Sequence, residues 1–282
     1  MFGFLNINKP KGMTSHDVVA VLRRITKIKQ IGHTGTLDPF ATGVLPVCIG
    51  NATRLSEYLH NDKSYIAQIK FGFNTDTYDC DGQITQTFDK KINREDLENI
   101  LKDFTGEIEQ LPPMYSAVKV NGKKLYEYAR KGEIVEIKPR KVTIYELKLL
   151  DFSYENQTAK IFIDCKSGTY IRSLAFDIAQ KLGTGAYLTE LTRTKSDIFE
   201  LENSLNLEGL TKETVEKNLI NPSKVLKMPM VEVAEADLKL IRNGMSLEKK
   251  SSDGFVGLVY NDELYAVGLA ENNIIKMKKV LL

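Results

Sequence analysis

The amino-acid sequence predicts an α+β protein with a mixed, largely antiparallel central sheet and a small β-rich C-terminal domain. Strand-like and helix-like segments form meanders interrupted by helices, without the regular alternation of a doubly wound sheet. Two strand-like runs, 142–152 and 158–165, are separated by a short polar turn, which is typical of an antiparallel pair. After linker-like proline dipeptides at 221–229, the remaining residues are rich in glycine and short alternating runs.

The first half of the chain opens with a short strand, 4–8, and a helix, 15–28, whose apolar positions recur at helical spacing. Ser15 is the expected cap of this helix, because a serine oxygen accepts from free N–H groups at a helix start. Glycine and proline crowd 32–46, which predicts an irregular loop. The segment 64–71 alternates and predicts a strand, and 94–104 predicts a helix.

The second half adds a strand at 115–120, which leaves through an Asn121-Gly122 turn into a helix at 123–131. The antiparallel pair follows. Thr169 is then the expected cap of a helix that continues to residue 182 and ends at a glycine.

Composition limits the possible functions without choosing one. The chain has 282 residues, 42% hydrophobic and 27% charged, which is enough for one large domain or two unequal ones. A net charge of +2 is too mild to indicate nucleic acid by itself. Three widely spaced cysteines form no C-x-x-C pair, so we expect free thiols and no metal site. No apolar run approaches the roughly 20 residues of a membrane span, and we expect a cytoplasmic protein.

The most unusual segment is GHTGTLDPFATGVLP, at 32–46. Its glycines permit backbone turns closed to other residues, and Pro39 holds Asp38 in an extended conformation. The Asp38 carboxylate is therefore expected on a stiff, preformed loop. Because Asp-Pro also opens many ordinary turns, composition alone favours a turn over a catalytic acid.

Several motifs together resemble the bacterial TruB family of transfer RNA pseudouridine synthases. They are NKPKGMTSHDVV, GHTGTLDPFATGVLP, NATRLSEYL, DKSYIAQIKFG, TDTYDCDG, LPPMYSAVKVNGKKLYEYARKG and CKSGTYIRSLAFDIAQKLG. They cover most of residues 4–195 in the family's order. The resemblance implies a catalytic domain at 1–225 with the pseudouridine synthase fold, and a PUA-like RNA-binding domain at 230–282, where the match is weaker.

The resemblance also implies that the protein isomerises uridine 55 in the T-loop of transfer RNA, with Asp38 as the catalytic aspartate. Breaking the bond from N1 to C1′ and rejoining C5 to the same carbon needs no redox change, so no cofactor is expected. Asp38 can attack C1′ or act as a base at C2′, and the sequence leaves both open. The T-stem-loop is the expected partner of a monomer that needs no protein partner and contacts no membrane.

The remaining site residues are assigned by resemblance. Arg172 is expected to keep Asp38 charged, and it lies in the first turn of its helix, where the macrodipole disfavours a cation. Tyr65 is expected to stack on the everted base. The other expected substrate contacts are Tyr170 and Leu191 beside the uracil, His33 against the displaced nucleotides, Asp79 as a polar group and Lys9 at a phosphate.

The chain departs from the family at one point. Family members often carry two arginines after the pocket leucine, whereas here only Arg193 follows Leu191, because the intervening residue is Thr192. This weakens the expectation of a phosphate contact there and leaves the pocket itself unaffected.

Three alternatives remain. An RNA-binding or tRNA-folding chaperone with little turnover could share the fold, although Asp38, Tyr65 and Arg172 together favour catalysis. A glycoside hydrolase also acts at C1′, but it needs a second carboxylate, for which Asp79 is the only candidate within the motifs. A guide-RNA-dependent relative is disfavoured by the uninterrupted bacterial-style insert at 115–132.

Overall fold

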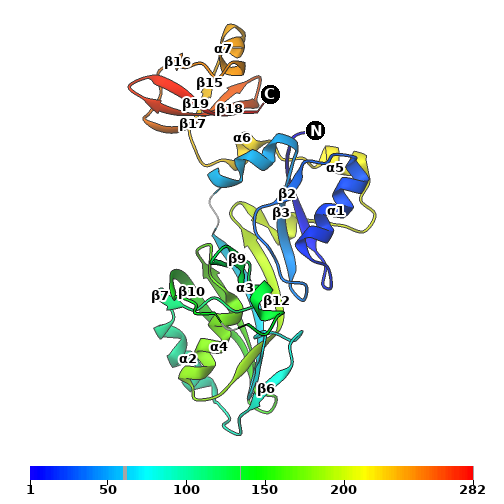
Figure 1. Cartoon of the computed structure of the whole chain (residues 1–282), viewed down its shortest axis with the longest axis vertical. Helices are drawn as coiled ribbons and strands as arrows, with labels where there is room; N and C mark the ends of the chain where they lie inside the picture. Colours follow the sequence, from blue (N-terminus) through cyan, green and yellow to red (C-terminus); the bar gives the residue numbers. More distant parts are fainter. Residues whose placement is uncertain (60–61, 134, 282) are drawn as a thin grey trace. The chain divides into compact units, whose positions relative to one another are not determined.

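The computed structural model describes residues 1–59, 62–133 and 135–281. Contacts between Cα atoms divide the chain into two compact units. Unit 1 comprises Met1–Pro39, Val44–His60 and Asp197–Leu282, and unit 2 comprises Phe40–Gly43 and Asn61–Ser196. Figure 1 traces the chain through both. This division differs from the expected one at 225–230, because the C-terminal segment shares a unit with the N-terminal residues. The expected domain boundary stays a prediction.

In unit 1, strand β1 (Gly3–Lys9) lies between β3 (Thr42–Ile49) and the short β14 (Leu205–Asn206). Strand β2 (Ile31–His33) pairs with β3 in antiparallel register. The predicted irregular loop at 32–46 is therefore wrong at both ends, and only the stretch between β2 and β3 is irregular. The strands form because the segment after the loop is almost wholly buried, and tertiary burial outweighs the weak strand propensity of glycine and proline.

Helix α1 (Ser15–Thr26) begins one residue earlier than its expected cap implies. Thr14 is the cap: its side chain accepts from the backbone N–H of Asp17, and the Asp17 carboxylate accepts from the backbone N–H of Thr14. This reciprocal capping box satisfies two N–H groups at the helix start. The prediction of Ser15 as cap is wrong, and its hydroxyl bonds to the backbone of Leu37 instead.

The C-terminal segment forms its own five-stranded sheet in the order β15 (Met230–Glu232), β17 (Gly254–Tyr260), β18 (Glu263–Glu271), β19 (Ile274–Val280) and β16 (Leu247–Glu248). One core cluster lies wholly inside this segment, with Ile241 from α7 (Leu238–Arg242) packed among strand residues. A second cluster joins Val267 and Leu281 to Phe4 and Leu55. The expected β-rich C-terminal domain is confirmed, and it shares buried apolar surface with the N-terminal part of unit 1.

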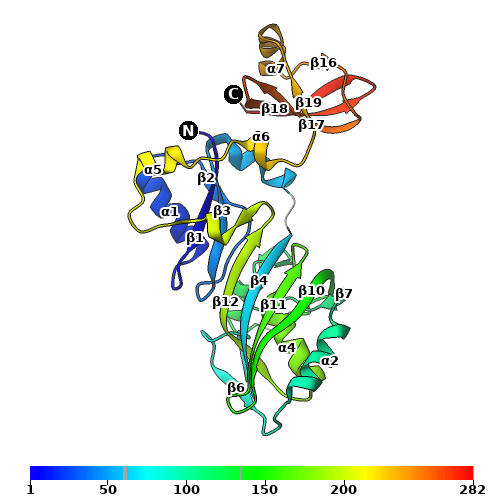
Figure 2. The same ribbon diagram turned by 180° about the vertical axis from the view of Figure 1, so that it is seen from behind.

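Unit 2 is built on a second run of strands, which Figure 2 shows side by side. They follow the order β12 (Ala186–Ser196), β4 (Lys63–Phe71), β11 (Thr158–Cys165), β10 (Arg140–Ser153) and β7 (Gly106–Gln110), and each neighbouring pair is antiparallel. Helices α2 (Arg94–Asp103) and α4 (Ile171–Lys181) lie on one face (Figures 1 and 2). The predicted fold class and the predicted pair β10–β11 are confirmed.

One further pairing, which is parallel, joins the start of β3 to β12 at the edge of the unit 2 strands. Thr42 and Gly43, at the start of β3, pair in parallel with Thr192 and Arg193 of β12. Strand β12 was not identified in the sequence, although it pairs with β4 along its whole length. The adjacent polar residues Thr189 and Glu190, the wholly polar run at 192–196 and two register shifts break the simple alternation that marks a strand.

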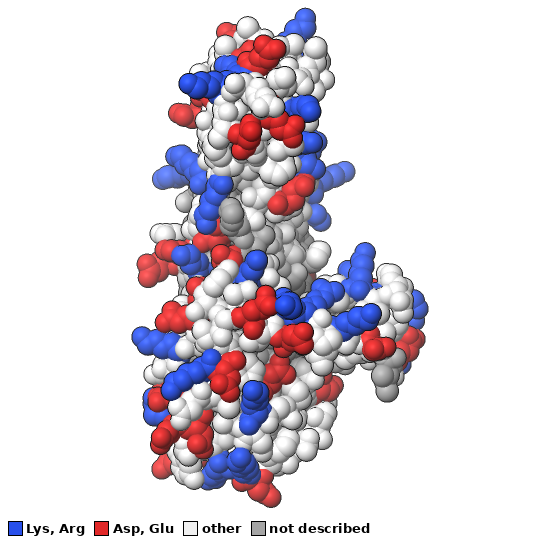
Figure 3. Space-filling model, turned by 90° about the vertical axis from the view of Figure 1, so that its left-hand side faces the viewer, with Lys and Arg blue, Asp and Glu red and all other residues white. Residues whose placement is uncertain are grey.

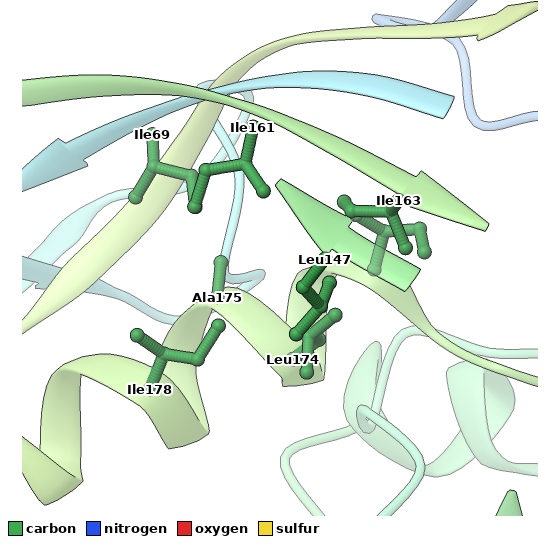
Figure 4. Close-up of a pocket in the computed structure, with 8 residues that line it drawn as sticks. Ile69, Leu147, Ile161, Ile163, Leu174, Ala175 and Ile178 are labelled. Carbon is green, nitrogen blue, oxygen red and sulfur yellow. The ribbon is translucent and has the colours of Figure 1, made fainter. Parts of the chain in front are cut away.

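Helix α4 packs on the sheet through apolar side chains alone. Leu174, Ala175 and Ile178 face Ile161 and Ile163 across a small gap, and no polar side chain lines it (Figure 4). Because this apolar side of α4 is buried against the sheet, the N-terminal end of the helix has a fixed position within unit 2.

The other elements are short and connect these parts. They are η1 (Gly50–Tyr58), β5 (Phe73–Thr75), β6 (Ile84–Thr87), β8 (Lys119–Val120), β9 (Lys123–Lys124), α3 (Leu125–Ala129), β13 (Phe199–Glu200), η2 (Leu201–Asn203), α5 (Lys212–Lys217), α6 (Pro222–Val225) and η3 (Glu235–Asp237). The predicted strand at 115–120 shrinks to two residues, and the predicted helix at 123–131 begins after β9. The expected Asn121-Gly122 turn is present, but it joins β8 to the strand β9 instead of leading directly into a helix.

Candidate active site

The Asp38 loop of unit 1 is held on both sides of the carboxylate. The Ser15 hydroxyl donates to the carbonyl of Leu37 at 3.1 Å and accepts from the N–H of the same residue at 2.8 Å. On the other side, the carbonyl of Pro39 accepts from the N–H of Gly12 at 2.8 Å. Because the neighbouring residues Leu37 and Pro39 are both held, the half-buried side chain of Asp38 projects from a backbone with little freedom.

Lys9 supports the same loop from inside. Its ammonium donates to the carbonyls of Met13 at 2.7 Å, Pro10 at 2.9 Å and Pro39 at 3.3 Å, and the residue is 0% exposed. A buried ammonium is tolerated when oxygen acceptors surround it. The expected phosphate contact of Lys9 is therefore wrong, because no surface of this residue is open to RNA. Its role is to tie the turn at 10–13 to the Asp38 loop.

His33 ends β2, immediately before the irregular stretch, and is half-buried. Its ring meets that of His16, in the first turn of α1, at 5.3 Å between centroids and 87° between planes. This edge-to-face arrangement places an exposed imidazole against the one named by resemblance. Sequence reasoning did not identify His16, since its position relative to His33 depends on how α1 packs on β2.

Tyr65 lies in the middle of the unit 2 sheet. On β4 it stands opposite Ile163 of β11 and Arg193 of β12, and it is 7% exposed. Burial lowers the pKa of Arg193, and a side-chain hydrogen bond with Tyr65 opposes that shift. Gly43 packs against the backbone of Arg193 so closely that an added Cβ would lie 2.2 Å from its carbonyl oxygen. Arg193, the one arginine that this chain keeps after the pocket leucine, is thus a buried neighbour of the expected stacking residue.

Arg172 and Asp79 form a buried ion pair. The guanidinium Nη1 lies 3.3 Å from Asp79 Oδ2, and the two side chains are 6% and 5% exposed. Two further N–H groups of Arg172 donate to the carbonyls of Thr77 at 3.1 Å and Tyr115 at 2.8 Å. The Thr77 hydroxyl also donates to Asp79 Oδ1 at 2.6 Å. Separate roles were expected for these two residues, and the structure joins them in one ion pair.

The start of α4 positions both Arg172 and Tyr170. The expected cap, Thr169, is wrong: its hydroxyl bonds to the carbonyl of Lys166, and Tyr170 occupies the cap position without a side-chain cap. Gln110 of β7 holds Tyr170 in this position, because its side-chain amide accepts from the N–H of Tyr170 at 2.8 Å and donates to its carbonyl at 3.0 Å. Tyr170 is half-buried, so its ring keeps an exposed side.

Leu191 lies on β12 opposite Ala67 of β4 and is 5% exposed. It shares the buried face of β12 with Arg193 two positions later, as strand alternation requires. Unit 2 therefore contains five of the expected substrate-binding residues, which are Tyr65, Asp79, Tyr170, Arg172 and Leu191, while unit 1 contains Asp38, His33 and Lys9.

Lys63 adds a second buried cation beside Arg193. Burial, followed by the charge of Arg193, lowers the pKa of Lys63 to about 8. Its ammonium contacts the hydroxyl of Ser167 at 3.3 Å. Elsewhere the charges are mixed, and Figure 3 shows basic and acidic side chains interspersed over one face of the molecule.

Comparison with known proteins identifies the family of this chain. The model of the "TruB family pseudouridylate synthase (N terminal domain)" matches residues 23–171, and that of the "tRNA pseudouridylate synthase B C-terminal domain" matches residues 172–230.

This chain belongs to the TruB family.

Its relatives cover nearly the whole chain. A tRNA pseudouridine synthase B of Clostridium tetani is 41% identical over 290 aligned positions, covering 100% of both chains. The same enzyme of Geobacillus thermodenitrificans is 47% identical and covers 88% of this chain and 86% of its own. The TruB family member described here is accordingly a tRNA pseudouridine synthase, an isomerase.

Solved structures agree on the fold. A Cbf5-Nop10-Gar1 complex contains a chain that is 27% identical to this one, with a TM-score of 0.75 over 100% of this chain and 85% of that one. An H/ACA RNP bound to a substrate RNA containing 2′-deoxyuridine gives 25% identity and a TM-score of 0.73. The pseudouridine synthase fold expected from the resemblance is confirmed.

The described residues contain neither a candidate metal site nor a candidate membrane-spanning helix. In residues 1–59, 62–133 and 135–281, no group of three His, Cys, Asp or Glu side chains is arranged to hold a metal ion. Within the same ranges, no helix is long and apolar enough to cross a membrane.

Proposed function

We propose that this TruB family enzyme isomerises uridine 55 in the T-loop of transfer RNA, with Asp38 as its catalytic group. The observation that supports Asp38 is the clamp around it, in which Ser15 holds Leu37, and Gly12 and Lys9 hold the carbonyl of Pro39. The half-buried carboxylate lies between these two held residues. A reacting group gains from such fixation, because the ordering cost is met during folding rather than at each turnover. An ordinary Asp-Pro turn needs no fixation of this kind.

In the proposed reaction the bond between N1 and C1′ breaks and a bond between C5 and C1′ forms. The proton leaves C5 and N1 gains one, so the atoms balance without oxidant or reductant. Asp38 either forms a bond to C1′ and is later displaced by C5, or removes the C2′ proton and later returns it. Both routes need the ionised carboxylate, and both end with the C5 hydrogen released to water.

Arg172 supports the ionised carboxylate in this proposal. A carboxyl group shielded from water by the bound nucleotide has a raised pKa, and a fixed cation nearby opposes that shift. Arg172 is held by Asp79 and two carbonyls, so its guanidinium cannot turn away. Asp79 in turn is the wrong second carboxylate for a glycoside hydrolase, because it is already paired with Arg172 and is 4% exposed.

Tyr65, Tyr170 and Leu191 are proposed to enclose the everted uracil, with Tyr65 stacking on its face. Base stacking on an aromatic side chain contributes about 1–3 kcal/mol per base, which helps to offset the lost stacking within the RNA. His33 is proposed to occupy the space that displaced nucleotides leave. A tRNA substrate is supported by the curated relatives, which are named tRNA pseudouridine synthase B and reach 41% identity over the full chain. The T-loop position rests on the resemblance of the motifs.

The test is the release of tritium from 5-tritiated uridine in an unmodified T-stem-loop, with the purified protein and no added cofactor. Asp38→Asn is expected to lower the rate by roughly a thousand-fold or more, because the substituted side chain neither attacks nor accepts a proton. The affinity for the stem-loop, measured by filter binding, is expected to stay within a few fold. Asp89→Asn, at an exposed position, is the matched control and should turn over at the native rate. Native-rate turnover by Asp38→Asn disproves the assignment.

A further inference from the structure

Arg193 is an expensive residue for the interior of a sheet. It is 0% exposed on β12, and its neighbour Lys63 is a second buried cation whose pKa it helps to lower. Removing a charged group from water costs several kcal/mol even after relaxation, and two like charges add to that cost. An apolar residue of similar volume would fill the same space without the penalty. Locally unfavourable choices of this kind mark functional positions more often than structural ones.

The neighbours of Arg193 indicate what it does. In the β4–β12 register it stands directly opposite Tyr65. Burial lowers the pKa of Arg193, and charge attraction to Tyr65 and a side-chain hydrogen bond with it oppose that shift. A guanidinium is planar and carries five N–H donors in a rigid fork, so it can fix the position of an acceptor oxygen better than a flexible ammonium can. The phenol oxygen lies at the far end of the ring, where one bond limits the swing of the whole side chain.

We propose that Arg193 is a positioning residue for Tyr65, holding the phenol so that the ring is already oriented for the everted base. The inference rests on the proposed function, since it assumes that Tyr65 stacks on the uracil. Side chains on strands have two common χ1 rotamers, and a ring free to exchange between them must be ordered at each binding event. A ring that is already fixed avoids that ordering cost.

Gly43 is part of the same arrangement. Its φ of +101° lies in the left-handed region, and its backbone pairs with that of Arg193. The carbonyl and N–H of Arg193 would lie 2.2 Å and 2.9 Å from an added Cβ, so no larger residue fits without moving β12. The close approach fixes the backbone from which Arg193 reaches Tyr65.

A direct contact of Arg193 with an RNA phosphate is the competing role. The burial of Arg193 argues against it, because a side chain with 0% exposure has no surface to offer a phosphate. Phosphate contacts of that kind also depend steeply on salt, and a buried hydrogen bond between two protein groups does not.

The experiment compares Arg193→Met, Arg193→Lys and Tyr65→Phe, alone and combined, in the tritium assay at saturating T-stem-loop. Arg193→Met is expected to lower kcat ten-fold or more and to raise KM less than three-fold. In the Tyr65→Phe background, the same change is expected to lower kcat less than two-fold, because the phenol oxygen is already gone. Arg193→Lys is expected to recover part of kcat only where Tyr65 is present. Lys160→Met, at an exposed position on β11, is the matched control and should keep native kcat and KM.

Each outcome decides the inference. Effects of Arg193→Met and Tyr65→Phe that simply multiply overturn it, and so does a KM effect that weakens steeply with added salt. If circular dichroism finds Arg193→Met unfolded, Tyr65→Phe decides alone, since it removes one oxygen and leaves the sheet intact: native kcat in that variant overturns the proposal. Absence of turnover by the unsubstituted enzyme would instead contradict the proposed function, so the two failures are distinguishable.

Discussion

The candidate residues of unit 1 and those of unit 2 are fixed by different kinds of interaction. Around Asp38 in unit 1, the fixing bonds end on backbone carbonyls and N–H groups, with one hydroxyl and one ammonium as the side-chain partners. Around Arg172 in unit 2, the fixing bonds join buried charges to each other and to carbonyls. The backbone bonds around Asp38 set the position of its carboxylate without adding a second carboxylate. The buried ion pair instead supplies the charge of Arg172 and fixes it in place. The comparison suggests that position and charge can be disturbed separately.

The largest expected effect comes from breaking the ion pair. Arg172→Met leaves the Asp79 carboxylate buried without its cation, which is expected to lower the free energy of unfolding by about 3–5 kcal/mol. Arg94→Met is the matched control, because Arg94 and Glu98 form an exposed pair whose loss costs about 1 kcal/mol or less. Urea denaturation followed by circular dichroism measures both. Combining Arg172→Met with Asp79→Asn should recover part of the stability, and equal losses in the two single arginine variants would contradict the comparison.

A smaller effect is expected from the clamp. Ser15→Ala removes the one hydroxyl that satisfies both backbone groups of Leu37, at a cost of about 1–3 kcal/mol in unfolding free energy. We expect kcat in the tritium assay to fall while the affinity for the stem-loop stays near native, because the loop loses position and no charge is lost. Ser56→Ala, at an exposed serine, is the control. A loss of affinity without a loss of kcat would show that the clamp serves binding instead.

The smallest expected effect is a pH dependence from Lys63. Its pKa is lowered to about 8 in the folded protein, below the value of about 10.4 in an unfolded chain, so the unfolded state holds the proton more tightly. The penalty for burying the charge is full below pH 8 and is relieved as the pH rises from 8 towards 10. The unfolding free energy of the native protein, relative to Lys63→Met, should therefore rise by about 1 kcal/mol between pH 8 and pH 9. A difference that stays constant over this range would contradict a buried, destabilised ammonium.

The same contrast explains what the sequence could predict. The strand at β4 and the pair β10–β11 were foreseen because alternation and a polar turn are local signals. Ser15 was assigned to the helix cap because the sequence does not reveal that Thr14 and Asp17 already satisfy those N–H groups. Its actual partner, Leu37, is 22 positions away and is brought near only by folding.

Arg193 shows the same limit in the pocket. The motif identified Leu191, and strand alternation would have placed Arg193 on the same buried face, but β12 itself was not recognised. Without its pairing to β4, nothing in the sequence puts this arginine opposite Tyr65. The residue types of the site were therefore within reach of motif comparison, and their partnerships were not.

The close approach at Gly43 has a consequence for protein engineering and for evolution. Adding a single methyl group at this position means moving a neighbouring strand, so a library that samples all twenty amino acids there should return glycine almost alone among active clones. The space at this position admits no residue larger than glycine. Directed evolution of a new substrate range would do better to keep Gly43 and vary exposed positions.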